Sequence, residues 1–304
     1  MKLATTTGDF SFYTADYVEQ IKNIKEAGFK YIDLSLYSPR ANDPLFSDDW
    51  KSEAKRIKSY MENNGLEFVQ SHGFNANCLG GAEKYKEGLE KTIRCIEICG
   101  ELGIPNTVVH SGYNKEMTDK DEWFEQNRKF YRELIPAMET YGVEVLCENT
   151  TKVNMPNWYF IVSGKETREF VEFVDHPLFA ACWDTGHAND EGAQYDEIIA
   201  LGDAMHAIHF NDNRGQKDEH LIPYMGTMNV DEVMHALIDV GFKGPFTFES
   251  SSVLHGSKYW LAKRRIFEED KRLFEPTLKM QKKMEDVLYT VGEHILTTYG
   301  LFDG

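Results

Sequence analysis

Eight short runs of β-branched and aromatic residues alternate with longer amphipathic helical stretches along most of the 304 residues of this chain. Neither a low-complexity linker nor a shift in composition interrupts the alternation. Strands that alternate with helices are typical of a parallel sheet, because each parallel connection needs a crossover. The predicted strands are Leu3–Thr7, Tyr31–Leu36, Leu66–Ser71, Thr107–His110, Glu144–Glu148, Phe179–Asp184, Met205–His209 and Pro245–Glu249.

Helical patterns fill the intervals between these runs, over Tyr17–Ala27, Trp50–Asn64, Lys84–Leu102, Glu122–Tyr141, Glu166–Val174 and Asp231–Val240. Five of the stretches end at a glycine, which commonly caps a helix in the left-handed conformation. These glycines are Gly28, Gly65, Gly103, Gly142 and Gly241. Eight strand–helix units in a chain of this length favour a (β/α)8 TIM barrel. The competing doubly wound sheet lacks its nucleotide motifs here, since no G-x-G-x-x-G follows the first strand and no G-x-x-x-x-G-K occurs.

We expect one domain over residues 1–304, with the barrel over about 1–255 and a helical extension over about 256–304. The extension reads as helical segments over Trp260–Tyr299, broken near Pro276. It carries a helical stripe of apolar residues, which predicts packing on its own barrel or on a sister subunit in a homo-oligomer. The stripe consists of Met280, Met284, Val287, Leu288, Val291 and Ile295.

The net charge and the composition exclude some classes of binding partner and cellular location. With 33 Lys+Arg against 50 Asp+Glu, the formal charge is -17, which disfavours a nucleic-acid partner because duplex binders neutralise phosphates with basic side chains. No signal-like apolar segment and no run of ~18 apolar residues occurs, so we expect a soluble cytoplasmic protein without membrane contact. The five cysteines have no framework spacing and indicate reduced thiols. Four of them, Cys95, Cys99, Cys147 and Cys182, are expected in the core.

Six consecutive predicted strands end in, or are followed directly by, a histidine or a carboxylate: His72, His110, Glu148, Asp184, His209 and Glu249. Three more follow in the loops: His187, Asp218 and His220. Barrel enzymes place their active sites at the carboxyl ends of the strands, so all nine should meet at one rim. Such a group is costly to bury without cations, and mixed imidazole and carboxylate donors suit zinc, manganese, iron or cobalt better than calcium. The sequence therefore predicts a metal site.

The motifs around these residues resemble those of the xylose isomerase-like barrel superfamily, from the first predicted strand to the eighth. The superfamily includes sugar isomerases, ketose epimerases, inosose dehydratases and endonuclease IV. The matching segments are Cys147-Glu148-Asn149-Thr150, Trp183-Asp184-Thr185-Gly186-His187, His209-Phe210-Asn211-Asp212, Asp218-Glu219-His220 and Phe248-Glu249-Ser250.

For the isomerase and epimerase branches, the resemblance implies one divalent ion (zinc, manganese, magnesium or cobalt) at four ligands: Glu148, Asp184, His209 and Glu249. It further implies that Glu148 and Glu249 act as acid and base and that His187 contacts substrate. The implied activity is isomerisation or epimerisation of a sugar, sugar phosphate or polyol through an enediolate. This chemistry is consistent with a cation that acidifies the carbon next to a carbonyl while a carboxylate transfers the proton.

The resemblance also leaves a nuclease open. In endonuclease IV the positions that match all nine residues bind three zinc ions, so the resemblance implies that His72, His110, His187, Asp218 and His220 are candidates for additional metal or substrate ligands. The acidic chain and the loop Gly73–Cys78, which lacks Lys and Arg, favour sugar chemistry. A binding protein without chemistry is a third reading.

Two further residues are candidates for substrate binding. Trp158 belongs to an aromatic segment, 154–160, that could form a wall against a sugar ring, with a subunit contact as the alternative. Arg214 could hold a hydroxyl or a phosphate, or be a solvated loop residue. The chain departs here from the ketose 3-epimerase pattern, because Arg214 lies one residue closer to His209 than the arginine of those enzymes and Asn154 replaces an acidic residue.

Overall fold

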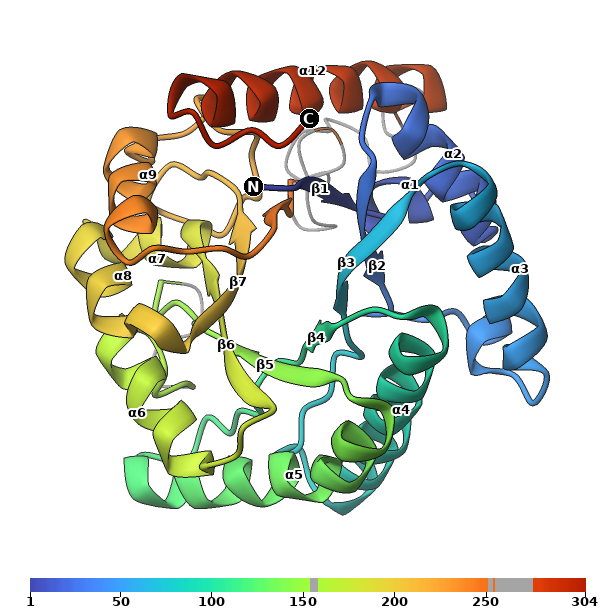
Figure 1. Ribbon diagram of the computed structural model, residues 1–304. Coiled ribbons are helices and arrows are strands. Elements are labelled where there is room, and N and C mark those ends of the chain that lie inside the picture. The colour runs from blue at the N-terminus through green and yellow to red at the C-terminus, as the bar shows by residue number, and fades with distance from the viewer. Residues whose placement is uncertain (154–157, 251–253, 255–275) are drawn as a thin grey trace, which may run out of the picture.

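The eight predicted strands form one parallel sheet that closes on itself, with β1 paired to β2 on one side and to β8 on the other. Figure 1 shows the barrel of the computed structural model with its helices arranged around the outside. The structure describes residues 1–153, 158–250, 254 and 276–304. The strands are β1 (Leu3–Thr6), β2 (Tyr31–Ser35), β3 (Glu67–His72), β4 (Asn106–Val108), β5 (Glu144–Glu148), β6 (Phe179–Asp184), β7 (Met205–Phe210) and β8 (Phe246–Phe248). The predicted TIM barrel is thus confirmed.

Helices lie on the outer face of the barrel, between successive strands and, for the last of them, after β8 (Figure 1). They are α1 (Gly8–Ser11), α2 (Tyr17–Ala27), α3 (Trp50–Asn63), α4 (Ala82–Leu102), α5 (Lys120–Tyr141), α6 (Gly164–Val174), α7 (Thr185–Glu191), α8 (Tyr195–Leu201), α9 (Val230–Asp239) and α12 (Leu278–Thr298), with 3-10 turns η1 (Pro44–Phe46) and η2 (Gly202–Ala204). The pattern did not predict α1, α7 or α8, which are each too short to display a helical period.

The glycines at the helix ends adopt the expected left-handed conformation. Gly28 has φ 114° and Gly103 has φ 75°, and the other three predicted caps also have positive φ. A residue with a Cβ is disfavoured in this region, so these glycines fix where each helix ends and the chain turns back toward the next strand. In the described part of the chain, no helix has both the length and the apolar character needed to cross a membrane.

Two apolar layers hold the barrel together. The large side chains, among them Trp123, Tyr131 and Phe170, are fully buried in the cluster to which the surrounding helices contribute. A separate small cluster consists of Val108, Leu146, Ala180, Cys182 and Ala207. All five cysteines are free and buried, as expected for the four assigned to the core. Strand residues point alternately to the two faces of a sheet, so the remaining inward positions near the strand ends are available for polar side chains.

Helix α12 lies across β1 and α2, and its carboxyl end reaches α9 (Figure 1). It packs on its own barrel, but not through the whole predicted stripe, because Met280 and Val287 are 49% and 40% exposed. The buried face comprises Gln281, Glu285, Leu288, Gly292, Ile295 and Leu296, of which Leu288 and Ile295 belong to the predicted stripe. Gly292 permits the close approach, since a Cβ there would lie 2.5 Å from Leu3 Cδ1. The predicted helical segment before Pro276 lies outside the described residues.

Glu285 of α12 and Asp9 of α1 form a buried pair of carboxyl groups. Burial raises the pKa of Asp9 to about 7, although its bond from the Thr5 hydroxyl, 2.8 Å long, acts against this rise. Burial and the nearby charge of Asp9 raise the pKa of Glu285 well above its usual range. The folded protein therefore keeps protons that the unfolded chain releases above about pH 4, so the pair lowers stability as pH rises from about 4 to 7.

We expect Glu285→Gln to raise the free energy of unfolding by about 1–2 kcal/mol at pH 8 and to leave it nearly unchanged at pH 4.5. The amide keeps the shape of the neutral acid but carries no proton to lose. Urea unfolding at both pH values measures the difference, with Glu293→Gln on the exposed face of the same helix as control. An equal effect of Glu285→Gln at the two pH values would contradict this account.

Candidate metal centre

The nine predicted rim residues lie at or just beyond the carboxyl ends of the strands. His72, Glu148 and Asp184 are the last residues of β3, β5 and β6. His209 lies in β7 one residue before its end, and Glu249 directly follows β8. His110 follows β4, His187 lies in α7, and Asp218 and His220 lie in the loop after β7. Barrel closure thus brings residues 177 positions apart in the sequence, His72 and Glu249, to a distance of 3.6 Å between Nε2 and Oε1.

Four of these residues form one group of donor atoms. One atom each from Glu148, Asp184, His209 and Glu249 lies within 4.8 Å of all the others. His209 Nδ1 is 2.6 Å from Glu148 Oε1 and 3.2 Å from Glu249 Oε2. The buried carboxylates of Glu148 and Asp184, the half-buried carboxylate of Glu249 and one imidazole are a donor set that holds zinc, manganese or cobalt, and carboxylates so close together repel one another without a cation. The residues fit a divalent ion.

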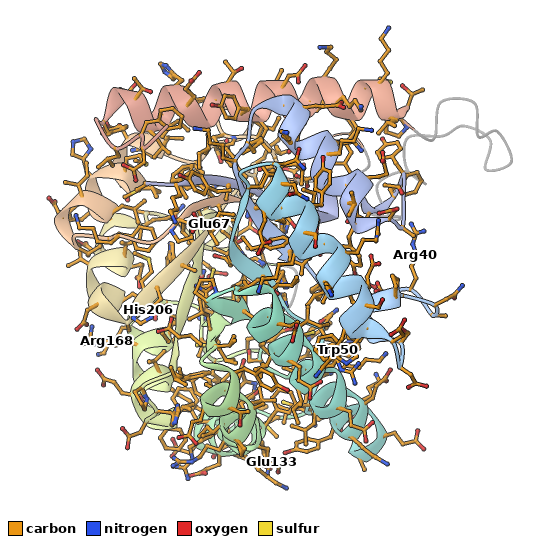
Figure 2. The ribbon with its side chains drawn as sticks, turned by 45° about the vertical axis from the view of Figure 1, so that its right-hand side comes forward. Arg40, Trp50, Glu67, Glu133, Arg168 and His206 are labelled. Carbon is orange, nitrogen blue, oxygen red and sulfur yellow. The ribbon has the colours of Figure 1, made fainter. Side chains whose placement is uncertain are left out.

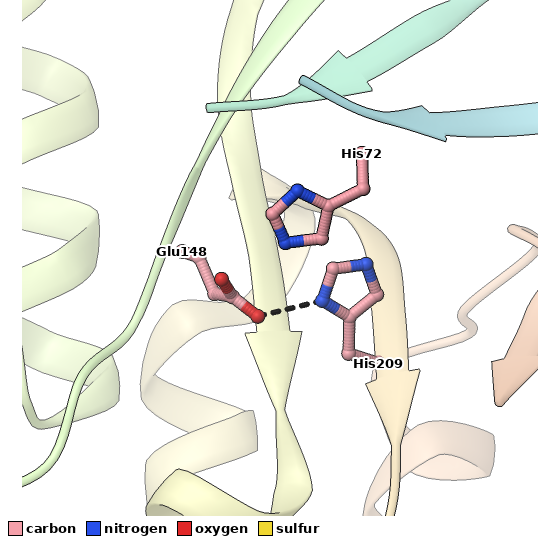
Figure 3. Close-up of side chains that lie close together, drawn as sticks. All are labelled: His72, Glu148 and His209. Atoms are coloured by element: carbon pink, nitrogen blue, oxygen red, sulfur yellow. Dashed lines mark hydrogen bonds and ion pairs between the residues drawn. The ribbon is translucent and has the colours of Figure 1, made fainter. Parts of the chain in front are cut away.

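Glu148 links this group to two further histidines. Its Oε2 lies 2.6 Å from His110 Nε2, while its Oε1 bonds to His209. Figure 3 shows the Glu148 carboxylate beside the rings of His72 and His209, which stack nearly in parallel with centroids 5.2 Å apart. His72, Glu148 and His209 form a second set of donors within 4.8 Å of one another.

A third set of donors comprises His187, Asp218 and His220. Asp218 lies between the two rings, 3.6 Å from His187 Nε2 and 2.9 Å from His220 Nε2. The opposite nitrogen of each ring donates to a backbone carbonyl, with Nδ1 of His187 2.8 Å from the oxygen of Asn149 and Nδ1 of His220 2.8 Å from the oxygen of Glu249. These contacts orient both imidazoles, and the Nε2 atoms face Asp218.

The electrostatics of the group favour ionised glutamates. Burial opposes the charge on Glu249, but His209 and His220 outweigh it and lower its pKa to about 2. Glu148 is likewise buried, and the charges of His209 and His110 lower its pKa well below the usual range. Burial raises the pKa of Asp184 to about 6 and lowers that of His72 to about 4. At neutral pH both glutamates can therefore accept a proton.

Two asparagines hold Asp184 in place. The Asn211 amide donates to Asp184 Oδ2 at 2.7 Å, and Asn149 Oδ1 accepts from the Asp184 backbone at 2.6 Å. Asp184 Oδ1 accepts from the backbone N–H of His187 and so caps α7. Gly186 is required by this arrangement, because a Cβ there would lie 1.9 Å from Asn211 Oδ1. The sequence motifs contain these residues, but only the closed barrel reveals their roles.

Sequence reasoning also missed Gln70 and Tyr37. The Gln70 amide nitrogen is 2.8 Å from His209 Nε2, which fixes the ring on the side away from Glu148. The Tyr37 ring packs edge-on against His72, with centroids 4.8 Å apart. The sequence could have indicated Gln70, because it lies two residues before His72 and therefore on the same face of β3.

A cavity of about 480 Å³ opens at this rim. Its lining includes His72, His110, Glu148, His187, Asp218, His220 and Glu249. The structure does not bring the two other predicted substrate residues into this lining. Arg214 is 59% exposed and pairs with Glu219 at 2.6 Å. Trp158 stacks on Tyr113 with centroids 4.9 Å apart, while residues 154–157 of its segment lie outside the described part of the chain.

The fold and this site define a TIM-barrel protein with a candidate divalent-metal centre at the carboxyl rim. The family model described as xylose isomerase-like TIM barrel matches residues 21–274. The chain belongs to this xylose isomerase-like family, as its motifs predicted.

Proteins similar to this chain include carbohydrate epimerases. The chain is 26% identical over 258 residues to a ketose 3-epimerase of Arthrobacter globiformis, covering 81% of each chain. Its fold matches that of D-psicose 3-epimerase from Clostridium cellulolyticum H10 with a TM-score of 0.76 at 18% identity, over 97% of this chain and 99% of the other. It also matches the IolI protein, solved with a zinc atom, with a TM-score of 0.76 at 15% identity over the whole of both chains.

Proposed function

We propose that the protein is a divalent-metal-dependent sugar epimerase or isomerase that acts on a ketose or a related carbohydrate through an enediolate. The observation that carries this proposal is the convergence of Glu148, Asp184, His209 and Glu249, with donor atoms within 4.8 Å, beside a cavity that Glu148 and Glu249 line. Similarity to a ketose 3-epimerase and to D-psicose 3-epimerase supports the same chemistry. Among the reactions of the family, these relatives favour epimerisation at the carbon next to the carbonyl.

A divalent ion held by these four residues would supply positive charge next to the substrate oxygens and so acidify the adjacent C–H bond. The proton itself is moved by the protein. Glu148 and Glu249 reach the cavity from β5 and from the end of β8, so that one carboxylate can take the proton and the other can return one to the opposite face of the same carbon. Their lowered pKa values keep both ionised before substrate binds.

His187 lies on the cavity wall and orients a substrate oxygen in this proposal. The Nδ1 atom of its ring contacts the carbonyl of Asn149, which fixes the plane of the imidazole. Its Nε2 atom faces Asp218 and can donate a hydrogen bond. A histidine held in this way positions an oxygen without being able to rotate away from it.

Deuterium incorporation tests the reaction class. Metal-loaded protein in D₂O is incubated with ketoses, aldoses, inososes and their phosphates, and exchange at each carbon is followed by NMR. We expect deuterium at one carbon next to a carbonyl, together with appearance of the epimer. Exchange without an epimer would favour an isomerase, and the absence of exchange across the whole panel would contradict enolising chemistry.

The three sets of donors support a second candidate, a zinc-dependent endonuclease for abasic sites. His72 joins one set, His187, Asp218 and His220 form another, and His110 contacts Glu148. A three-zinc nuclease would need metal ligands spread over several such groups. The charge of -17 opposes it, because a phosphate-tracking surface needs basic side chains. Counting bound zinc and assaying the nicking of an abasic duplex discriminate the two candidates.

A further inference from the structure

The cavity extends well beyond the metal-binding residues. Seven of its 21 lining residues are the histidines and carboxylates of the rim, and the others come from two segments, Thr6–Gln20 and Ser35–Pro44. We call the part lined by these two segments the distal arm. The volume of about 480 Å³ lies in the range of cavities that hold ligands larger than a single sugar ring.

The distal arm is a built surface that continues from the metal-binding residues. The backbone N–H of Leu36 donates to the His72 carbonyl at 2.7 Å, and the Tyr37 carbonyl accepts from Asn75 at 2.9 Å. Farther out, Asp43 accepts from the Tyr17 hydroxyl at 2.8 Å. These bonds fix the segment after β2 against β3 and α2, so its side chains are presented to the cavity in a defined arrangement.

Arg40 distinguishes the arm from the rest of the cavity. It is the lone Lys or Arg in the described lining, whereas four carboxylates and four histidines line the same space. Within the described ranges, the Arg40 guanidinium has no carboxylate within ion-pair distance, and it donates to the carbonyl of Ser11. Figure 2 shows Arg40 at the edge of the molecule opposite to Glu67 and His206, which lie where β3 and β7 begin.

The carboxylate on the same segment, Asp43, makes no described hydrogen bond to this guanidinium, although the charge of Arg40 acts against the rise that burial causes in the pKa of Asp43. Asp43 is engaged by the Tyr17 hydroxyl and by the backbone N–H of Leu45, at 2.8 and 3.0 Å, and caps η1. Arg56 and Arg168, by contrast, each form an ion pair with a carboxylate. A guanidinium with unused donors at the end of a cavity is suited to a phosphate or carboxylate, which it can bind with two hydrogen bonds.

We propose that the distal arm is a subsite for an anionic substituent, so that the substrate is a small carbohydrate carrying a phosphate or a carboxylate, with the anion at Arg40. This inference rests on the proposed function for the sugar end of the substrate. The binding of the anion itself does not depend on that function. Tyr37, three residues before Arg40 on the same segment, packs on His72 and contributes the wall along which the carbohydrate lies.

The test compares three substrates, D-fructose, D-fructose 6-phosphate and D-fructuronate, in the metal-loaded wild type, in Arg40→Gln and in Arg128→Gln. Arg128 is a matched control on α5, where it pairs with Glu125 away from the cavity. We expect Arg40→Gln to lower kcat/KM for the preferred anionic substrate by about 10- to 100-fold and to leave the neutral ketose within about twofold. The two anions show whether a phosphate or a carboxylate is recognised.

A binding measurement separates the subsite from the catalytic proposal. Calorimetric titration with D-glucitol 6-phosphate, which has no carbonyl and cannot react, should show binding that Arg40→Gln weakens by the same factor and Arg128→Gln does not. Arg40-dependent binding without turnover of any ketose would remove the proposed function and keep the subsite. Turnover of neutral ketoses with no preference for anions, unchanged in Arg40→Gln, would overturn the subsite and keep the function.

Discussion

Glu249→Gln is expected to lower the rate of epimerisation and of deuterium exchange by at least about 10³-fold while the protein stays folded. Glu249 lines the cavity, and His209 and His220 lower its pKa to about 2, so that it is ionised and able to accept a proton at neutral pH. The amide of glutamine keeps the size and one oxygen of the side chain but cannot take up the proton. The loss should therefore appear in kcat rather than in the unfolding temperature.

Three measurements make this result specific. Exchange is followed by NMR from each of the two epimers, unfolding is followed by circular dichroism, and bound metal is counted in both proteins. Glu293→Gln, the same substitution on the exposed face of α12, is the matched control. A Glu249→Gln protein that binds its metal and retains a near-normal rate would remove Glu249 from the role of proton carrier.

Removal of the divalent ion is expected to abolish turnover, and addition of manganese, cobalt, zinc or magnesium should restore it. Without a cation, histidines are the positive groups that the described residues place beside the carboxylates of Glu148, Asp184 and Glu249, and the charge that acidifies the substrate is lost. One ion per chain is the expected stoichiometry for an epimerase. Nearly three zinc ions per chain, together with nicking of abasic duplexes, would instead establish the nuclease.

The same ion should stabilise the fold and compete with protons. Binding to the folded chain alone adds about 4 kcal/mol to the free energy of unfolding when the free ion is present at about 1,000 times its Kd. Although burial opposes it, contacts with Cys182, Glu249 and Glu148 raise the pKa of His209 well above its usual range in the metal-free protein. Since the ion displaces that proton, its affinity should fall as the pH falls. Activity that persists in excess chelator would contradict a metal-dependent enzyme.

The barrel and the rim could be predicted because both depend on local periodicity. The alternation of strands and helices predicts where each strand ends. The residue at the carboxyl end of a strand lies at the carboxyl rim once the sheet closes into a barrel. Glu148 and Asp184 end β5 and β6 as predicted, and α2 covers the predicted range Tyr17–Ala27. The distances within the group needed the closed barrel, because His72 and Glu249 meet across the interior from strands far apart in the sequence.

The parts that escaped prediction depend on tertiary packing. In α12 the apolar stripe predicts burial of Met280, but the groove over β1 and α2 takes Gln281 and Glu285 instead, through the close approach at Gly292. Arg214 could be a substrate ligand by its position in the chain, yet its nearest carboxylate, Glu219, lies only five residues away and holds it. Arg40 carries no motif at all, and only the shape of the cavity draws attention to it.

The five buried thiols make local and global opening of the barrel measurable, because each thiol reacts only when it becomes exposed. Alkylating reagents attack the thiolate, and burial raises the pKa of Cys78, Cys99 and Cys182 to about 12, so the closed protein offers them almost no reactive sulfur. Labelling must wait for a fluctuation that exposes a given cysteine. Cys182 belongs to the small inner cluster and Cys99 to the large one that includes the helices, so peptide-resolved labelling rates can separate detachment of the helical layer from rupture of the strands.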